Sequence, residues 1–232
     1  MSAADGAFAG PLRRGGHWLW EARGDGVRAI FAGAGAKGTR DEVLSRVAGR
    51  PLPLAWAKQV HSSTVLAAAP GACGEGDALV TREPCLALAV ATADCVPVLL
   101  AGPEGVAAVH AGWRGLAAGV LPAAVRAATP VPSRWTAWIG PAIGPCCYEV
   151  GEDVAERVAA ASNREVLTPG AAGRPHLDLP GAAHRQLASA GLGAILLLRH
   201  CTRCDPERLA SYRRDGQAAG RNYAYVWREP AA

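Results

Sequence analysis

Residues 85–125, CLALAVATADCVPVLLAGPEGVAAVHAGWRGLAAGVLPAAV, combine short apolar runs with an alanine-rich segment. Three runs have the length and near-continuous apolar character of strands that are covered on both faces: residues 86–92, 96–101 and 105–111. Residues 116–128 predict a helix, with a kink or a restart at Pro122. We therefore expect this stretch to form the buried centre of the fold.

Three reactive side chains interrupt these apolar strands. Asp94 and Cys95 lie between the first two predicted strands, and His110 lies at the end of the third. A buried carboxylate, thiol or imidazole needs a partner, because burying it unpaired is costly. The residues alone leave two interpretations open. One is a hydrogen-bonded turn with a structural cysteine and a core histidine; the other is that Cys95 and His110 meet to bind a metal or to react.

The composition is that of a globular enzyme. The 232 residues are enough for one core, and we predict a single domain over residues 1–232 in which residues 1–16 could be disordered. Half of the residues are hydrophobic and 19% are charged. The net charge of +4 comes from scattered arginines, without a basic helix. No apolar run reaches the ~18 residues of a membrane span. We therefore expect a cytoplasmic protein that binds neither nucleic acid nor membranes.

The seven cysteines are an odd number at irregular spacing, which is a poor disulfide framework. We expect thiols or metal ligands instead. The adjacent Cys146 and Cys147 could be ligands, but small buried thiols are the favoured interpretation. Cys201 and Cys204 form a CxxC pair, which supplies only half of a zinc knuckle and supports a structural zinc weakly.

The flanking patterns predict further elements. Upstream they predict a hairpin at residues 17–31, a flexible glycine-rich loop at 32–38, a helix at 39–47 and a loop at 71–76. Thr39 and Glu42 form a plausible capping box for that helix. Residues 56–66 alternate like a strand that carries His61. Downstream, the paired Gly-Pro units of residues 140–145 predict a rigid path of the kind that shapes a pocket wall.

Several motifs together resemble the YfiH/laccase-domain family, also called multicopper polyphenol oxidases. Members are described as purine nucleoside phosphorylases and, in some accounts, as a peptidoglycan-editing factor. The motifs are QVH (59–61), DALVT (77–81), TADCVPVL (92–99), HAGWRG (110–115), IGPAIGP (139–145), YEVG (148–151), CT (201–202) and SYRRDG (211–216). The match is strongest over residues 55–228, and TADC followed by HAGWRG is highly specific. The resemblance implies an α+β fold, a single YfiH-like domain of layered mixed β-sheets flanked by helices.

The resemblance also implies that His61, Cys95 and His110 are the metal-binding, catalytic positions. Two imidazoles and one thiolate are good zinc ligands and leave a position open, whereas copper is the weaker candidate. The implied activity is zinc-dependent phosphorolysis of adenosine, inosine and S-methyl-5′-thioadenosine. Adenosine deamination, in which the metal activates a water for attack on the purine, is implied as well. The expected partners are a purine nucleoside and phosphate.

Four more residues receive roles by this interpretation. Asp94, next to Cys95, is the candidate for proton transfer. Gln59, Arg114 and, more weakly, Arg213 are the candidates for binding substrate and phosphate.

The N-terminal part departs from the family pattern. Relatives usually carry a Phe-Ser/Thr-x-Arg-x-Gly-Gly-Val-Ser segment, whereas Phe31 here is followed by AGAGAKGTR, without that arginine at its expected place. If the arginine binds phosphate or substrate in relatives, this chain is slower, altered in substrate or inactive. Lys37 or Arg40 are the available substitutes.

Other functions compete with the phosphorylase. A cysteine-type amidase that edits peptidoglycan precursors would use Cys95 as nucleophile and His110 or His61 as base. A catalytically weakened relative would act as a binding protein. A polyphenol oxidase or laccase is least favoured, because the chain has six histidines, no His-x-His pair and one methionine.

Overall fold

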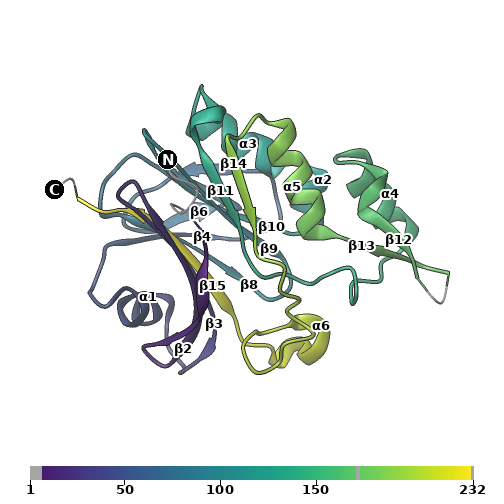
Figure 1. Cartoon of the computed structure of the whole chain (residues 1–232), viewed down its shortest axis with the longest axis horizontal. Coiled ribbons are helices and arrows are strands. Elements are labelled where there is room, and N and C mark those ends of the chain that lie inside the picture. The colour runs from purple at the N-terminus through teal and green to yellow at the C-terminus, as the bar shows by residue number, and fades with distance from the viewer. Residues whose placement is uncertain (1–6, 171–172, 231–232) are drawn as a thin grey trace.

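Two mixed β-sheets lie face to face at the centre of the computed structural model, which describes residues 7–170 and 173–230 (Figure 1). The seven-stranded sheet has the order β1 (Ala9–Arg14), β2 (His17–Gly24), β3 (Val27–Gly35), β15 (Asn222–Arg228), β8 (Ala87–Thr92), β4 (Leu54–Lys58), β6 (Gly71–Glu75). The six-stranded sheet has the order β14 (Ala194–Leu197), β11 (Thr136–Ile139), β9 (Val96–Gly102), β10 (Gly105–Ala111), β7 (Ala78–Thr81), β5 (Val65–Ala67). A small hairpin joins β12 (Leu167–Pro169) and β13 (Pro175–Leu177).

Both large sheets contain parallel and antiparallel pairs. The β4 strand runs parallel to β6 and β8, β5 runs parallel to β7, and β11 runs parallel to β14. The other pairs in the two sheets, among them β9 with β10 and β15 with β8, are antiparallel. The predicted α+β class with layered mixed sheets is confirmed.

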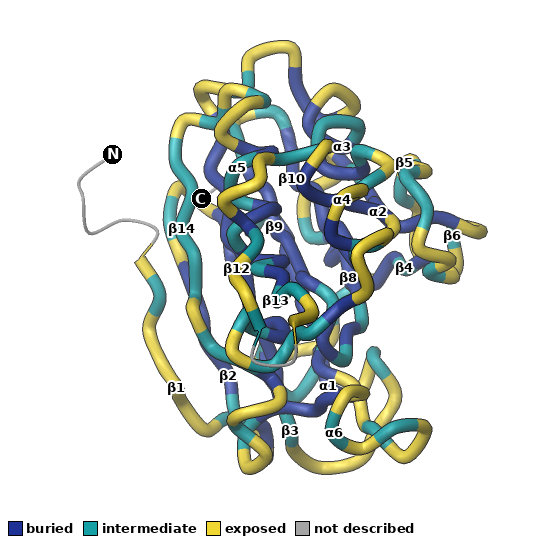
Figure 2. Tube along the Cα trace, turned by 90° about the vertical axis from the view of Figure 1, so that its right-hand side faces the viewer, coloured by how far each residue is buried: buried dark blue, intermediate teal, exposed yellow. Residues whose placement is uncertain are grey.

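The β9 strand shows why the central apolar runs have no polar face. Val96, Val98 and Leu100 point to the helices, whereas Leu99 and Ala101 point to the other sheet. Because successive side chains of a strand alternate between its faces, a strand between two packed layers needs apolar residues at every position. The strands β8, β9 and β10 are accordingly buried almost throughout (Figure 2).

Helices cover the outer faces of the two sheets. The α1 helix (Arg40–Ala48) packs on the seven-stranded sheet. Four helices lie against the six-stranded sheet or against one another on that side: α2 (Trp113–Ala117), α3 (Val120–Ala128), α4 (Glu152–Ala160) and α5 (Leu179–Ser189). The short α6 (Tyr212–Asp215) and three 3₁₀ turns, Pro132–Arg134, Arg164–Val166 and Gly216–Ala218, complete the described helical elements.

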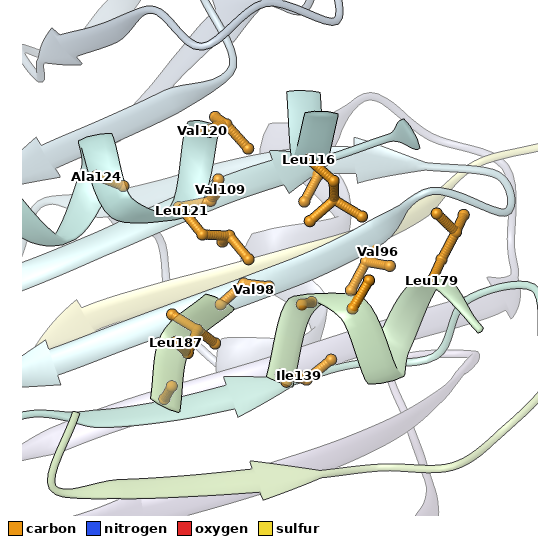
Figure 3. Close-up of a cluster of buried hydrophobic side chains, with 14 of the residues drawn as sticks. Val96, Val98, Val109, Leu116, Val120, Leu121, Ala124, Ile139, Leu179 and Leu187 are labelled. Carbon is orange, nitrogen blue, oxygen red and sulfur yellow. The ribbon is translucent and has the colours of Figure 1, made fainter. Parts of the chain in front are cut away.

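The α3 and α5 helices meet the six-stranded sheet in one apolar cluster (Figure 3). Leu121 of α3, Leu187 of α5 and Val98 of β9 are fully buried in it. Burying side chains of this size contributes about 1.5–3 kcal/mol each. This layer therefore supplies a large part of the stability that fixes the strand ends, where the polar residues lie.

Local signals predicted several elements correctly. The strands at residues 86–92, 96–101 and 105–111 are confirmed as β8, β9 and β10. The capping box is present as well: the Thr39 hydroxyl accepts from the Glu42 N–H, and the Glu42 carboxylate accepts from the Thr39 N–H. The N-terminal segment forms β1 from Ala9 and pairs with β2, whereas residues 1–6 lie outside the described residues.

The predicted break at Pro122 was wrong by three residues. The chain ends α2 at Ala117 and restarts at Gly119, which adopts the left-handed φ of 75°. Pro122 then lies in the first turn of α3, where its missing N–H costs no helical hydrogen bond. Glycine at 119 makes the restart possible because it has no Cβ to oppose positive φ.

Two predicted loops are strands. Residues 32–35 extend β3, and residues 71–75 form β6. A Cβ at Gly33 would lie 2.1 Å from the carbonyl oxygen of Arg208, and one at Gly35 would lie 2.3 Å from Nδ1 of His17. These glycines are therefore needed because neighbouring atoms pack close to their backbone, and not to make the segment flexible. None of the described helices is both long enough and apolar enough to cross a bilayer.

Candidate active site

A turn between β4 and β5 positions His61. The predicted continuous strand over residues 56–66 was wrong, because the chain leaves the sheet after Lys58. The carboxylate of Asp77 gathers this turn. It accepts from the backbone N–H groups of Val60, His61 and Ser62 at 3.3, 3.0 and 2.6 Å, and from the Ser62 hydroxyl at 2.8 Å. The hydrogen bonds to Asp77 thus decide the conformation of residues 60–62, in place of the strand that the local alternation predicted.

A second turn, between β8 and β9, carries Asp94 and Cys95. Asp94 is buried, and its two carboxylate oxygens accept from the Thr202 hydroxyl at 2.5 Å and the Arg213 backbone N–H at 2.6 Å. Asp94 has φ of 91° and His61 has φ of 60°, in the region that residues other than glycine rarely adopt. Such strain persists only where surrounding contacts determine it, and it concentrates at functional sites.

These turns bring His61, Cys95 and His110 together. Nε2 of His61 lies 3.9 Å from Sγ of Cys95, and the imidazole centroids of His61 and His110 are 4.8 Å apart. The possible ligand atoms of the three residues all lie within 4.8 Å of one another. A Cβ at Gly112 would lie 2.9 Å from the His61 ring and 3.0 Å from the sulfur, so only glycine leaves room for this arrangement.

Asp77 also orients His110. The Nδ1–H of His110 donates to Asp77 Oδ1 at 2.8 Å, and neither side chain is appreciably exposed. This bond leaves Nε2 of His110 free to face Cys95. Burial raises the pKa of Asp77, but hydrogen bonds from His110 and Ser62 outweigh it and hold the pKa well below its usual range.

The hydrogen bonds of the cluster also shift its other groups. Burial raises the pKa of the Cys95 thiol, but bonds with His110 and His61 outweigh it and lower the pKa to about 6. Burial lowers the pKa of His110, but Asp77 and Cys95 outweigh it and raise the pKa to about 9. Without a metal, the arrangement therefore favours a thiolate beside an imidazolium.

The cluster fits a zinc ion. Zinc binds histidine nitrogen at about 2.0–2.1 Å and thiolate sulfur at about 2.3 Å, so adjacent ligand atoms around a tetrahedral ion lie about 3.5 Å apart. The 3.9 Å between His61 and Cys95 needs little adjustment to reach this value. A carboxylate behind the histidine, as Asp77 is here, commonly supports metal-binding imidazoles. The Cys/His cluster can thus hold a metal ion.

The cluster opens into a cavity of about 970 Å³. Aromatic side chains of Trp56, Trp113 and Tyr148 form part of its wall. Four arginines also line it: Arg40, Arg114, Arg213 and Arg221. Three of them lie over aromatic rings, at 3.9 Å for Arg40 on Trp56, 4.5 Å for Arg114 on Trp113 and 4.9 Å for Arg213 on Tyr148.

No carboxylate among the described residues forms an ion pair with these four arginines. Thirteen other basic side chains in the same ranges do pair with carboxylates: Arg14, Arg23, Arg28, Arg50, Lys58, His110, Arg134, Arg164, Arg174, Arg185, Arg199, Arg208 and Arg214. Arginine recognises phosphate and carboxylate groups through several parallel hydrogen bonds. The cavity can therefore accept an anionic ligand next to the Cys/His cluster.

All seven residues that were predicted to act in catalysis, metal binding or substrate binding line this cavity: Gln59, His61, Asp94, Cys95, His110, Arg114 and Arg213. The amide of Gln59 pairs with the backbone of Ala91, donating to its carbonyl at 2.7 Å and accepting from its N–H at 2.8 Å. Of the two suggested substitutes for the missing arginine, Arg40 lines the cavity and Lys37 does not. The backbone carbonyl of Lys37 accepts a hydrogen bond from the Arg46 guanidinium instead.

Sequence reasoning gave Asp77 and Tyr148 no role, although both lie within quoted motifs. For Asp77 the available signal was a carboxylate that directly precedes the buried β7 strand, where it must find partners. For Tyr148 no pattern in the sequence pointed to the cavity. Its position comes from the turn formed by residues 144–148, where its N–H donates to the Gly144 carbonyl.

Comparisons with known proteins identify the relatives of this chain. The family model described as multi-copper polyphenol oxidoreductase laccase matches residues 34–229. A Streptomyces coelicolor protein named purine nucleoside phosphorylase is 40% identical over 235 residues, which cover 92% of this chain and 96% of that protein. The Escherichia coli purine nucleoside phosphorylase YfiH is 40% identical over 177 residues, which cover 74% of this chain and 72% of YfiH.

Solved structures resemble the chain over nearly its whole length. The crystal structure of Neisseria meningitidis protein NMB0706 matches with a TM-score of 0.82 and 31% identity, over 91% of this chain and 99% of that chain. The crystal structure of YlmD from Geobacillus stearothermophilus matches with a TM-score of 0.84 and 26% identity, over 97% and 100% of the two chains. The residues that the family model matches contain the Cys/His cluster and every residue that lines the cavity.

Proposed function

The chain belongs to the family described as multi-copper polyphenol oxidoreductase laccase, and we propose that it is a zinc-dependent purine nucleoside phosphorylase. Relatives of about 40% identity bear the phosphorylase name. The observation that carries the proposal is one cavity in which the Cys/His cluster adjoins four arginines without carboxylate partners. We propose adenosine, inosine and S-methyl-5′-thioadenosine as the nucleosides.

Zinc is the metal that suits His61, Cys95 and His110, because it accepts nitrogen and thiolate ligands and tolerates an open fourth position. When bound, zinc would supply Lewis acidity and an activated water, which is the chemistry that adenosine deamination needs. We propose this deamination as a second activity of the same cavity. Asp77 contributes by holding the His110 ring and the His61 turn in place before any metal arrives.

Phosphorolysis makes a separate demand on the protein. A phosphate oxygen forms a bond to C1′ of the ribose while the bond from C1′ to the purine nitrogen breaks, and the leaving purine takes a proton. Arg114 is our principal candidate for holding the phosphate, with Arg213 a weaker one and Arg40 a replacement for the arginine missing from the N-terminal segment. The aromatic wall of Trp113 and Tyr148 offers faces for the purine and ribose.

Asp94 is our candidate for moving the proton. Each of its oxygens accepts one hydrogen bond and retains a further lone pair for a proton. Replacement by asparagine tests this role. A proton-transfer role predicts a lost limb in the pH profile of kcat for Asp94→Asn, whereas a purely positioning role predicts a raised KM with the profile retained.

The decisive experiment incubates the purified protein with adenosine and phosphate and separates the products. Adenine and ribose 1-phosphate in equal amounts support phosphorolysis, and inosine shows deamination. His61→Ala should abolish both, while His184→Ala on α5, outside the cavity lining, serves as the matched control. Binding of adenosine without any product would overturn the phosphorylase proposal in favour of a binding protein.

The second candidate is a cysteine-type amidase acting on peptidoglycan precursors. Its support is the 3.9 Å approach of Cys95 Sγ to His61, the arrangement of a thiol nucleophile with its base. Metal analysis separates the two functions. Stoichiometric zinc that is lost in Cys95→Ser favours the phosphorylase, whereas a metal-free protein that cleaves amides and is inactivated by thiol alkylation favours the amidase. The polyphenol oxidase remains least favoured, because two histidines and one cysteine form a single-ion site.

A further inference from the structure

Four cysteines outside the Cys/His cluster converge at one point. Cys146 and Cys147 lie in the turn after β11, and Cys201 and Cys204 lie in the segment after β14. Their sulfur atoms all lie within 4.8 Å of one another. Sγ of Cys204 is 3.3 Å from that of Cys147 and 3.7 Å from that of Cys146. None of the four lines the cavity described above.

We propose that these four cysteines form a second metal site, a tetrathiolate that binds one zinc ion and has a structural role. Zinc–sulfur bonds of about 2.3 Å place the sulfurs of a tetrahedral site about 3.8 Å apart. The two sulfur–sulfur separations of 3.3 and 3.7 Å are at or slightly below this distance, and no two of the four sulfurs are more than 4.8 Å apart. Four thiolates fill the coordination of zinc and leave no position for substrate.

The backbone prepares the site without help from an ion. The N–H of Gly144 donates to Sγ of Cys201 at 3.3 Å, a bond that stabilises a thiolate ligand. A Cβ at Gly144 would lie 3.3 Å from Sγ of Cys146 and 3.4 Å from Cβ of Cys201, so glycine keeps this approach open. Ala142 pairs with the Cys201 segment in a β-bridge, in which Thr202 N–H donates to the Ala142 carbonyl at 3.0 Å.

Arg214 fixes the backbone of the turn that carries Cys201 and Cys204. The guanidinium of Arg214 donates to the carbonyls of Thr202 and Arg203 at 2.9 and 3.4 Å. The same guanidinium pairs with the Asp215 carboxylate at 2.8 Å, so Arg214 contributes to the site through these hydrogen bonds and not through an unpaired charge.

Disulfides explain the arrangement less well. A disulfide joins two sulfurs at about 2.05 Å in an exclusive pair. Here Cys204 contacts both Cys146 and Cys147, and Cys201 lies within the same small volume. The cluster thus has a common centre rather than two separate pairs.

The bound ion would join two segments that adjoin residues of the cavity. Tyr148, which lines the cavity, directly follows Cys147. Thr202, which donates to Asp94, directly follows Cys201. We therefore assign the second zinc to holding these two segments together, a role that the Cys/His cluster does not share.

Metal counting tests the proposal and keeps it separate from the proposed function. With both sites filled, the wild-type protein contains two zinc ions per chain, and the double variant Cys201→Ser/Cys204→Ser and the single variant Cys95→Ser each lose one. Cys73→Ser, which changes a cysteine in neither cluster, keeps both. If only the double variant loses zinc, the result supports the second site and contradicts the proposed catalytic zinc. Zinc lost only in Cys95→Ser overturns the second site.

The wild-type protein provides a test that needs no folded variant. If the four thiols bind zinc, they resist alkylation until a chelator is added, and no reductant is needed; Cys146 and Cys204 are exposed enough for the chelator to act. Alkylation that requires a reductant indicates disulfides, and alkylation that requires neither indicates free thiols. Either result overturns the proposal. X-ray absorption at the zinc edge should show a site with four sulfurs at about 2.3 Å, and iron in place of zinc would overturn the assignment.

Discussion

The two cysteine-containing clusters differ in ligand number, in neighbours and in backbone conformation. The Cys/His cluster offers three ligands and faces a cavity of about 970 Å³, with Asp77 fixing one of its histidines. The four-cysteine cluster offers four ligands of one type and lines no part of that cavity. Of the four described non-glycine residues with positive φ, His61 and Asp94 belong to the first cluster or its neighbouring turn, and none belongs to the second.

This difference indicates how one chain can use similar ligands for different purposes. An incomplete ligand set in a strained setting leaves a position for a reactant. A complete set on unstrained backbone satisfies the ion and leaves nothing to react. The first arrangement suits chemistry and the second suits stability, although both draw on cysteine.

The largest expected effect separates the clusters by activity. Cys95→Ser should lower kcat/KM for adenosine phosphorolysis about a thousandfold, because it removes several kcal/mol of transition-state stabilisation. Cys204→Ser should change kcat/KM less than about tenfold while lowering the melting temperature, because the four-cysteine cluster contributes no residue to the cavity lining. Steady-state kinetics and thermal unfolding of both variants measure this contrast. Equal losses of activity would erase the distinction drawn between the clusters.

A smaller effect is expected from the carboxylate behind the histidine. Asp77→Asn should reduce metal affinity or activity of the Cys/His cluster by about 10–100-fold, the usual cost of losing such a partner. The zinc of the four-cysteine cluster should remain. Metal titration at limiting zinc, followed by a kinetic assay, measures both. Asp25→Asn, in an exposed turn, is the matched control, and a loss of zinc from both clusters would show general unfolding instead.

The cavity arginines should produce an effect on one substrate only. Arg114→Ala should raise KM for phosphate about tenfold, since hydrogen bonds to charged groups contribute about 1.5–3 kcal/mol. KM for adenosine should change little, and Arg114→Lys should give an intermediate value. Arg126→Ala on α3 controls for the loss of one surface charge. A raised KM for adenosine alone would place Arg114 at the nucleoside and not at the phosphate.

The last effect is on stability and is expected at Glu21, which belongs to neither cluster and does not line the cavity. Burial raises the pKa of this carboxyl, but hydrogen bonds from Arg14 and Arg28 outweigh it and lower the pKa to about 2. A depressed carboxyl pKa stabilises the fold above its unfolded value of 4.5, and the stabilisation disappears as the pH falls from there towards 2. At neutral pH it amounts to at most about 3 kcal/mol.

Urea unfolding of metal-free protein across this pH range tests the Glu21 contribution. Glu21→Gln should be less stable than the wild type at pH 7, and the difference should shrink as the pH approaches 2. Glu75→Gln, which changes an exposed pair with Lys58, should follow the wild type closely. If the difference in stability between Glu21→Gln and the wild type persists unchanged at low pH, packing and not charge accounts for the role of Glu21.

The sequence predicted the buried strands well because their signal is local. The central runs contain no polar residue apart from Thr92 and His110, and Thr39 with Glu42 carries its own capping chemistry. It failed where a distant group decides the conformation. The turn that carries His61 exists because Asp77 gathers its N–H groups, and β6 exists because β4 offers a parallel edge. In both cases the partner lies too far along the sequence to affect the local hydrophobic periodicity.

The amino-acid sequence by itself determined which residue types are present, the β8, β9 and β10 strands and the motifs that carry the family likeness. The tertiary structure alone decided that Cys146 and Cys147 meet Cys201 and Cys204, and that Arg40 joins Arg114 in one cavity. The physical reason is the range of the interactions. Burial and capping act between near neighbours along the chain, whereas ligand sets and anion sites require side chains from distant segments to share a point in space.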